Sequence, residues 1–261
     1  MQLLFRWFNK ARTDEEQADP RQALVSFYSP KSAAGEAYRM LRTNIHFSTG
    51  GESLKVIQVT STFPSEGKSL VAANLAITFA QAGDSVILVD TDMRRSSVHT
   101  KFEIPISPGL SEALVTGNVE ASLRPGPVEG LRLMPAGTRP PNPSELLHSR
   151  RMDDVLEKLR GMADLIVLDT PPTLAVADAN ILAPKADGVV MVVNIGMSDK
   201  HANKHAVDAL RGVNARILGT VITGIQPARS SNGYYRKYRY DRYYYYYDAY
   251  YDTDDSEHQN N

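Results

Sequence analysis

Cysteine is absent from the sequence, so no framework of disulfide bonds can hold the fold together. No apolar run reaches the roughly 20 residues that a membrane-spanning helix needs, and the short apolar run at the start is interrupted by Arg6, unlike a typical signal peptide. An excess of charge is missing too, because 29 Lys and Arg residues stand against 30 Asp and Glu residues. This balance gives no reason to expect nucleic acid as a partner. We therefore expect a cytoplasmic protein whose 261 residues can bury one main core.

A phosphate-binding loop is predicted in residues 60–69, which read Thr-Ser-Thr-Phe-Pro-Ser-Glu-Gly-Lys-Ser. The apolar residues before it, 54–59, predict a buried strand, and the alanine-rich residues 70–81 predict a helix. In such a turn, the backbone N–H groups and the positive end of the helix point at one anion. Lys68 can then reach the β- and γ-phosphates, and the Ser69 hydroxyl can ligate Mg²⁺. The segment expected to hold the phosphates of ATP comprises Pro64, Ser65, Glu66, Gly67, Lys68, Ser69 and Leu70.

The loop departs from the usual pattern at one position. A glycine normally stands five residues before the Gly of the Gly-Lys-Ser triplet, and here Thr62 takes its place. A chance Gly-Lys-Ser at the start of a helix is the alternative interpretation. The strand, turn and helix around the triplet, together with two aspartate motifs farther along the chain, favour the phosphate loop.

The two aspartate motifs follow apolar strands. Residues 86–89 predict a strand that is buried on both faces, and Asp90 and Asp92 come just after it. Residues 165–168 predict a second such strand, which ends at Asp169 in the form of a Walker B carboxylate. Ligands bind at the carboxyl edge of open α/β sheets, so the three carboxylates are candidates for holding Mg²⁺ and a substrate hydroxyl. For the Asp-x-Asp pair alone, ordinary turn chemistry is the alternative.

Strands and helices alternate through the chain, which predicts an α/β fold with a doubly wound, mainly parallel sheet of the P-loop NTPase type. A helix is expected over residues 32–47, with Ala37, Met40, Leu41 and Ile45 facing the core. Further helices are expected over residues 109–117 and 199–211 and from about Ser144. Further strands are expected over residues 131–134, 188–194 and 217–222.

The two ends of the chain differ in composition from this core. Residues 1–28 are expected to form an N-terminal segment and linker, residues 29–226 the nucleotide-binding domain, and residues 227–261 a flexible tail. On a helix, residues 1–11 would present apolar and basic side chains on opposite faces. Such a helix suits docking onto a membrane surface or a membrane-bound partner, and folding back onto the domain is the alternative.

The tail lacks aliphatic residues beyond Ala249, so we expect it to be disordered. It is open to three interpretations: a low-complexity tail without a specific role, a surface for stacking bases of single-stranded nucleic acid, or a bank of phosphoacceptors. Its acidic end weighs against nucleic acid. The candidate acceptors are Tyr234, Tyr235, Tyr238, Tyr240, Tyr243, Tyr244, Tyr245, Tyr246, Tyr247, Tyr250 and Tyr251.

The ordered set of motifs resembles the bacterial tyrosine kinases, which are the autokinases of capsular and extracellular polysaccharide systems. The phosphate loop, the segment from Asp90 to Arg94, the segment from Asp169 to Pro172 and the terminal tyrosines carry this resemblance. It runs from about Ser29 to the end of the chain and includes the segment from Pro141 to Leu147. It also includes Glu36, Arg39 and Arg42, which look like a Glu-x-x-Arg-x-x-Arg subunit-contact motif.

The resemblance implies that the chain transfers phosphate from ATP to its own tail tyrosines, between the subunits of a ring. In this scheme Lys68 binds the transferred phosphate, and Ser69, Asp92 and Asp169 hold Mg²⁺. Asp90 accepts the proton of the tyrosine hydroxyl or orients it, and Arg94 supports the phosphates. The ring contacts come from Glu36, Arg39 and Arg42.

The resemblance also implies partners. The chain lacks the two membrane spans of the fused members of the family, so it resembles the split type, whose activator is a separate transmembrane chain-length protein. That partner would recruit the kinase to the inner face of the membrane, and a cognate phosphotyrosine phosphatase would reverse the reaction.

Two rival functions belong to other classes. A ParA/MinD-like ATPase switch would carry a signature lysine where Phe63 stands and would have no use for a tyrosine bank. A scaffold that binds nucleotide without transferring phosphate can be distinguished only by activity. Related folds often place an Asn that meets adenine after a late strand, and Thr223 stands there instead, so the adenine contact stays unassigned.

Overall fold

Seven strands form one sheet in the order β3-β4-β2-β5-β1-β6-β7. All neighbouring strands are parallel except β3, which runs antiparallel to β4 at one edge. This arrangement confirms the predicted doubly wound, mainly parallel sheet. The strands are β1 (Val56–Ser61), β2 (Val86–Asp90), β3 (Arg124–Pro125), β4 (Leu131–Met134), β5 (Leu165–Asp169), β6 (Gly188–Asn194) and β7 (Ile217–Thr223).

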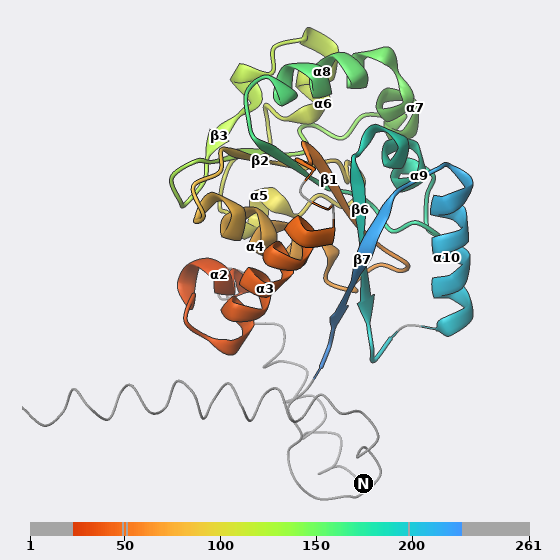
Figure 1. Cartoon of the computed structure of the whole chain (residues 1–261). Helices are drawn as coiled ribbons and strands as arrows, with labels where there is room; N and C mark the ends of the chain where they lie inside the picture. Colours follow the sequence, from red (N-terminus) through yellow and green to blue (C-terminus); the bar gives the residue numbers. More distant parts are fainter. Residues whose placement is uncertain (1–22, 49, 51, 198, 226–261) are drawn as a thin grey trace, which may run out of the picture.

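The structure, a computed structural model, describes residues 23–48, 50, 52–197 and 199–225 (Figure 1). The predicted amphipathic helix of residues 1–11 and the tyrosine cluster lie outside this range. In the part that is described, no helix is both long and apolar enough to cross a membrane.

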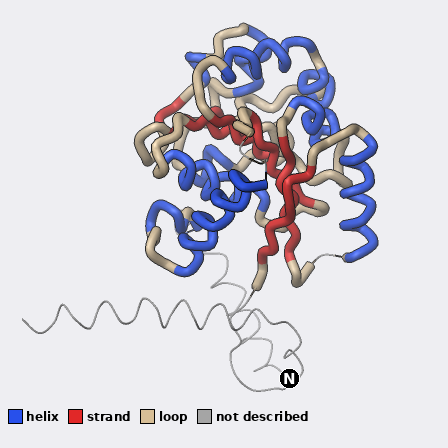
Figure 2. Tube along the Cα trace, viewed as in Figure 1, coloured by secondary structure: helices blue, strands red, loops and turns tan. Residues whose placement is uncertain are grey.

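Helices cover both faces of the sheet (Figures 1 and 2). Along the strands, successive apolar side chains turn to opposite faces: Ile57 packs with one group of helices and Val56 with the other. The first face carries α2 (Val25–Tyr28), α3 (Ala33–Ser48), α4 (Lys68–Ala80) and α5 (Val98–Lys101). The second carries α6 (Leu110–Thr116), α7 (Pro143–His148), α8 (Arg150–Arg160), α9 (Asp178–Leu182) and α10 (Lys200–Gly212), and short 3₁₀ turns span η2 (Glu120–Ser122) and η3 (Ala183–Lys185).

Helix α3 begins where the sequence predicts, after Ser32, whose hydroxyl accepts a hydrogen bond from the backbone N–H of Gly35 at 3.1 Å. The predicted inward face is only half right. Ile45 is buried, but Ala37 and Met40 are exposed. The helix is rotated because Gly35 packs closely on the backbone of Pro30, where a Cβ atom would come within 2.5 Å of the carbonyl oxygen.

The inward position next to Gly35 on this helix belongs to Tyr38. Burial raises the pKa of the Tyr38 phenol to about 12, and its hydrogen bond to Asn74 of α4 only partly opposes this. A prediction that places only apolar residues on the inward face of a helix misses a tyrosine such as Tyr38, whose hydroxyl is hydrogen-bonded inside the protein.

The short helix α2 is tied to α4 by the same asparagine. The Asn74 side chain accepts from the backbone N–H of Ser26 at 2.9 Å and donates to the carbonyl oxygen of Ala23 at 3.0 Å. Leu24 is buried beneath this pair. The domain boundary after residue 28 stays a prediction. In the structure, residues 23–28 pack against α4 of the nucleotide-binding domain.

Glu112 of α6 holds together three segments at the carboxyl edge of the sheet. Its carboxylate accepts hydrogen bonds from the backbone N–H groups of Gly109 (2.7 Å) and Thr138 (3.0 Å) and from the Ser107 hydroxyl (3.1 Å). Burial alone would raise the pKa of Glu112, but these donors outweigh it and lower that pKa to about 2. The carboxylate therefore fixes the start of the proline-rich loop that follows Thr138.

We predict that Glu112→Gln lowers the free energy of unfolding near neutral pH, because the amide loses the charge that these donors favour. The folded pKa lies below the unfolded value, so the contribution of Glu112 is present above about pH 4.5 and is lost as the pH falls toward 2. Urea unfolding of both proteins at several pH values measures this difference. A difference that stays constant from pH 7 to the lowest pH at which the fold persists would contradict the assignment.

Candidate active site

The phosphate loop connects β1 to α4, as the sequence predicts, and a buried glutamate shapes it. The Glu66 carboxylate accepts hydrogen bonds from the backbone N–H of Phe63 at 2.7 Å and of Asn194, at the end of β6, at 3.3 Å. Glu66 is fully buried, so this charge is held by backbone donors rather than by water. Its side chain braces the loop from inside.

The backbone of the loop turns through two residues with positive φ, Ser65 at 66° and Gly67 at 92°. The Thr223 hydroxyl donates a 2.7 Å hydrogen bond to the carbonyl oxygen of Glu66, and its methyl group lies beside Gly67. In this structure Thr223 therefore supports the phosphate loop. The first backbone hydrogen bond of α4 runs from Val71 to Gly67, which leaves the N–H groups of the first turn to face the loop.

Lys68 points its ammonium group at two carboxylates. Its Nζ atom lies 3.1 Å from Oδ2 of Asp92 and 3.4 Å from Oδ1 of Asp169, and it donates to the Ser69 hydroxyl at 3.1 Å. Burial works against the charged form of Lys68, but the nearby carboxylates, Asp169 first among them, outweigh it and raise the pKa. The ammonium is therefore firmly charged.

Parallel strand registers bring the carboxylates together. Asp90 of β2 and Asp169 of β5 are register partners, and Asp169 is also paired with Val59 of β1. All three strands end at the same edge, where Asp92 follows β2 by two residues. The prediction that the three carboxylates share this edge is thus met by the geometry.

Asp90 makes contacts of a different kind. Oδ1 accepts from the backbone N–H of Asp92 at 3.1 Å, and Oδ2 accepts from those of Ser97 and Val98 at 2.9 and 3.0 Å. Burial, followed by the charge of Asp169, raises the pKa of Asp90 to about 7, although the backbone donors oppose this. In the structure, this side chain anchors the turn that carries Asp92 and the start of α5.

Asp169 leaves one oxygen without a protein partner. Its Oδ2 atom is buried and accepts no hydrogen bond within the described residues. Burial raises the pKa of Asp169, against the opposing effects of the Lys68 charge and the Ser69 hydroxyl. A buried carboxylate oxygen without a donor needs compensation, and a cation supplies it.

The oxygen ligands at this site fit a Mg²⁺ ion that is bound together with a nucleotide. No three His, Cys, Asp or Glu side chains converge into a complete metal site in the described part of the chain. Mg²⁺ does not require one, because it keeps several waters and takes one or two carboxylates together with substrate phosphates. The free oxygen of Asp169 and the Ser69 hydroxyl beside it match this chemistry.

The Arg94 side chain is paired with residues of α9 and α7 in this structure. Its Nε atom is 3.1 Å from Oδ2 of Asp178 in α9, and one terminal nitrogen donates to the Ser144 hydroxyl of α7 at 2.9 Å. Ser144 in turn donates to the other oxygen of Asp178. Because Asp178 is fully buried, this triad ties together the segments that follow β2, β4 and β5.

The predicted subunit-contact residues lie on α3. Arg39 pairs with Glu36 and donates to the carbonyl oxygen of Pro30 at 2.7 Å, whereas Arg42 donates to the carbonyl oxygen of Thr78 in α4 at 2.9 Å. Arg42 therefore already has an acceptor within its own chain. The Glu36 and Arg39 side chains keep part of their surface exposed.

Comparisons with known proteins agree with this geometry. Residues 54–212 match the family model described as an AAA domain. The tyrosine-protein kinase YwqD of Bacillus subtilis is 38% identical over 214 residues, which cover 81% of this chain and 90% of that protein. The chain belongs to the bacterial tyrosine kinases. Other relatives are longer, and this chain spans only 22–31% of the length of several tyrosine-protein kinases among them.

Solved structures of the same family resemble this tyrosine kinase closely. The chimerical protein CapA2B2 superimposes with a TM-score of 0.75 at 34% identity, over 78% of this chain and 90% of that one. The kinase domain of Escherichia coli ETK gives a TM-score of 0.76 at 30% identity, over 82% of this chain and 84% of that one. The match therefore covers the whole described body and not the phosphate loop alone.

Sequence reasoning missed the residues that hold the kinase loops in place. Asp178 carries a signal, since it is the lone carboxylate in residues 173–184, which are mostly apolar. Asn194 acts through its backbone, and no side-chain pattern reveals it. Asn203 accepts a hydrogen bond from the Thr62 hydroxyl at 2.6 Å across 141 residues, a pairing that only the fold creates.

We predict that Arg94 and Asp178 are energetically coupled. Arg94→Ala leaves the fully buried Asp178 carboxylate without its cation and should cost more unfolding free energy than Asp178→Ala, which leaves a partly exposed Arg94. A double-mutant cycle should give a coupling of about 1–2 kcal/mol. Equilibrium urea unfolding of the four proteins measures it.

Arg95 provides the matched control, because it is the exposed neighbour and its side chain makes no hydrogen bond or ion pair with Asp178. The cycle between Arg95→Ala and Asp178→Ala should give a coupling near zero. Equal couplings in the two cycles would show that the triad has no special role.

Proposed function

We propose that this tyrosine kinase is an autokinase that transfers the γ-phosphate of ATP to the tyrosines of its own C-terminal tail, between subunits. The observation that carries this proposal is the ammonium of Lys68, held by Asp92 and Asp169 at the end of a phosphate loop. The tail supplies eleven acceptor phenols within residues 234–251 of the same chain. A tethered acceptor raises the local phenol concentration to about the mM range.

The chain's residues serve positioning and charge neutralisation, which phosphoryl transfer needs more than covalent help. The backbone from Pro64 to Leu70 cradles the phosphates, and Lys68 leaves its carboxylates to bind the transferred group. Ser69, Asp92 and Asp169 hold Mg²⁺, which supplies positive charge to the phosphate oxygens when it is bound. The free oxygen of Asp169 supports this assignment.

We assign Asp90 and Asp92 different parts. Asp90 has both oxygens occupied by backbone donors, so it fixes the turn that aims Asp92 and acts as a positioning residue. Asp92 accepts from the backbone N–H of Arg95 through Oδ1 and from Lys68 through Oδ2, so its Oδ2 atom becomes open to Mg²⁺ or to the phenol hydroxyl once Lys68 turns to the phosphate. Arg94 acts through Asp178 and Ser144, which hold the surrounding loops.

The biological setting is part of the proposal. We place the kinase at the inner face of the cell membrane, recruited there by a separate transmembrane activator, with residues 1–11 as one docking element. Its output is control of polysaccharide polymerisation and export, and a cognate phosphotyrosine phosphatase resets it. The resemblance of the ordered motifs to the autokinases of capsular and extracellular polysaccharide systems supports this setting.

We predict a ladder of added phosphates in the intact mass of the kinase after incubation with MgATP, together with the cytoplasmic segment of its activator. Lys68→Met should give no ladder, because the transferred phosphate loses its cation. Peptide mapping should place the phosphates in the tail, and changing Tyr243 to Tyr247 into Phe should shorten the ladder.

Lys204→Met is the matched control, since Lys204 is an exposed lysine on α10 whose ammonium makes no hydrogen bond or ion pair with a described residue. It should leave the ladder unchanged. The shortened tail variant should still phosphorylate an added tyrosine substrate. Binding of nucleotide without any ladder, even with the activator segment, would favour the ATPase switch or the scaffold.

We also predict that subunits assemble through the exposed part of α3. Glu36→Ala combined with Arg39→Ala should convert the ring to monomers, as measured by light scattering, and lower transfer between subunits. Glu52→Ala with Arg216→Ala removes another surface ion pair and is the matched control. If both double variants assemble like the parent, α3 is not the contact.

A further inference from the structure

Lys101 is a cation beside the candidate site for which the described residues supply no anionic partner. It is the last residue of α5, the helix whose first N–H groups bind Asp90. The Lys101 ammonium makes no hydrogen bond and no ion pair with any residue that the structure describes. Lys68 and Arg94, the other two cations of this region, are both paired with carboxylates.

The electrostatic surroundings of Lys101 are those of the active site. Burial lowers the pKa of its ammonium, and the charges that act on it next are Asp169, Lys68 and Asp90, in that order. All three belong to the carboxyl edge where the phosphate loop lies. A partly buried ammonium without an anion is costly, and an anion bound there recovers that cost.

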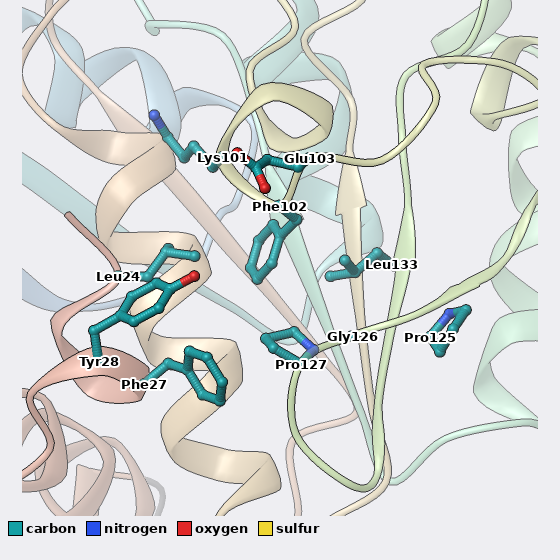
Figure 3. A pocket seen from close by; sticks show the side chains of 10 residues that line it. All are labelled: Leu24, Phe27, Tyr28, Lys101, Phe102, Glu103, Pro125, Gly126, Pro127 and Leu133. Carbon is teal, nitrogen blue, oxygen red and sulfur yellow. The ribbon is translucent and has the colours of Figure 1, made fainter. Parts of the chain in front are cut away.

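The direction of the side chain agrees with this placement. Lys101 borders a cavity of about 220 Å³, which Leu24, Phe27, Phe102 and Leu133 line with apolar groups (Figure 3). Phe102 turns into this cavity, whereas the Lys101 ammonium points away from these apolar side chains (Figure 3). The aliphatic stem of Lys101 thus borders the cavity, and its ammonium group lies outside it.

We infer that Lys101 binds a terminal phosphate group at the active site, as a second cation beside Lys68. The inference rests on the proposed transfer reaction and adds to it a residue that no motif of the sequence indicates. Two phosphate groups pass through the site, the γ-phosphate of ATP and the phosphate of phosphotyrosine. Both are terminal phosphates that offer several oxygens to an ammonium.

The anchoring of α5 explains how Lys101 can serve this purpose. Asp90 binds the N–H groups of Ser97 and Val98, so the first turn of the helix is fixed to the end of β2. Lys101 is the last residue of this single-turn helix, three residues beyond Val98, and its flexible four-carbon stem can follow a phosphate during transfer. Lys68, packed among carboxylates, has less freedom.

The experiment compares the affinities of the full-length kinase for MgATP, MgADP and O-phosphotyrosine by calorimetry. Lys101→Met should weaken binding by about tenfold for the probe that carries the recognised phosphate. Loss of MgATP affinity with MgADP affinity retained assigns Lys101 to the γ-phosphate. Loss of O-phosphotyrosine affinity alone assigns it to the product.

Lys101→Arg should restore most of the lost affinity, since it keeps the charge, and it stays informative if the Met variant folds poorly. Lys204→Met is the matched exposed control. Unchanged affinities for all three probes in a folded Lys101→Met protein would overturn the inference. Because binding is read directly, this outcome differs from a failure of the proposed function, in which the parent kinase shows no transfer at all.

Discussion

The structure depends on one electrostatic constraint: a buried ammonium, that of Lys68, must be balanced where three strands end. Asp92 and Asp169 balance it at 3.1 and 3.4 Å, and they can do so because parallel pairing puts β1, β2 and β5 in adjacent positions. Moving any one strand by a residue would separate a charge from its partner and exchange the side chains that pack against the two layers of helices. The strand pairing therefore brings the carboxylates to Lys68, and the ion pairs in turn favour that pairing.

A second group of residues keeps this arrangement in place without touching a substrate. Glu66 holds the phosphate loop from inside, Asp90 holds the turn before α5, and Asp178 holds the loops after β4 and β5 through Arg94 and Ser144. All three are buried carboxylates whose oxygens are bound by N–H or O–H donors. Electrostatic catalysis works through groups that are already oriented, and these carboxylates provide that orientation.

The sequence predicts the parts of the fold that repeat a simple pattern. Apolar runs that end in aspartate identify β2 and β5, and the Gly-Lys-Ser triplet between a strand and a helix identifies the loop. What it cannot predict are pairings that only the fold creates, such as Thr62 with Asn203, or Arg94 with Asp178. It also misjudges α3, because Gly35 and Tyr38 set the rotation of that helix through a close backbone contact and a buried hydroxyl, neither of which an apolar pattern contains.

The contact between Thr223 and Glu66 joins residues that are 157 positions apart. The phosphate loop lies in the first third of the chain, yet one support comes from β6, through the N–H of Asn194, and another from the last residue of β7. During synthesis the loop is made early but gains these supports only after β7 has left the ribosome and joined the sheet. The phosphate loop therefore gains its full set of supports only late in synthesis, immediately before the tyrosine tail emerges.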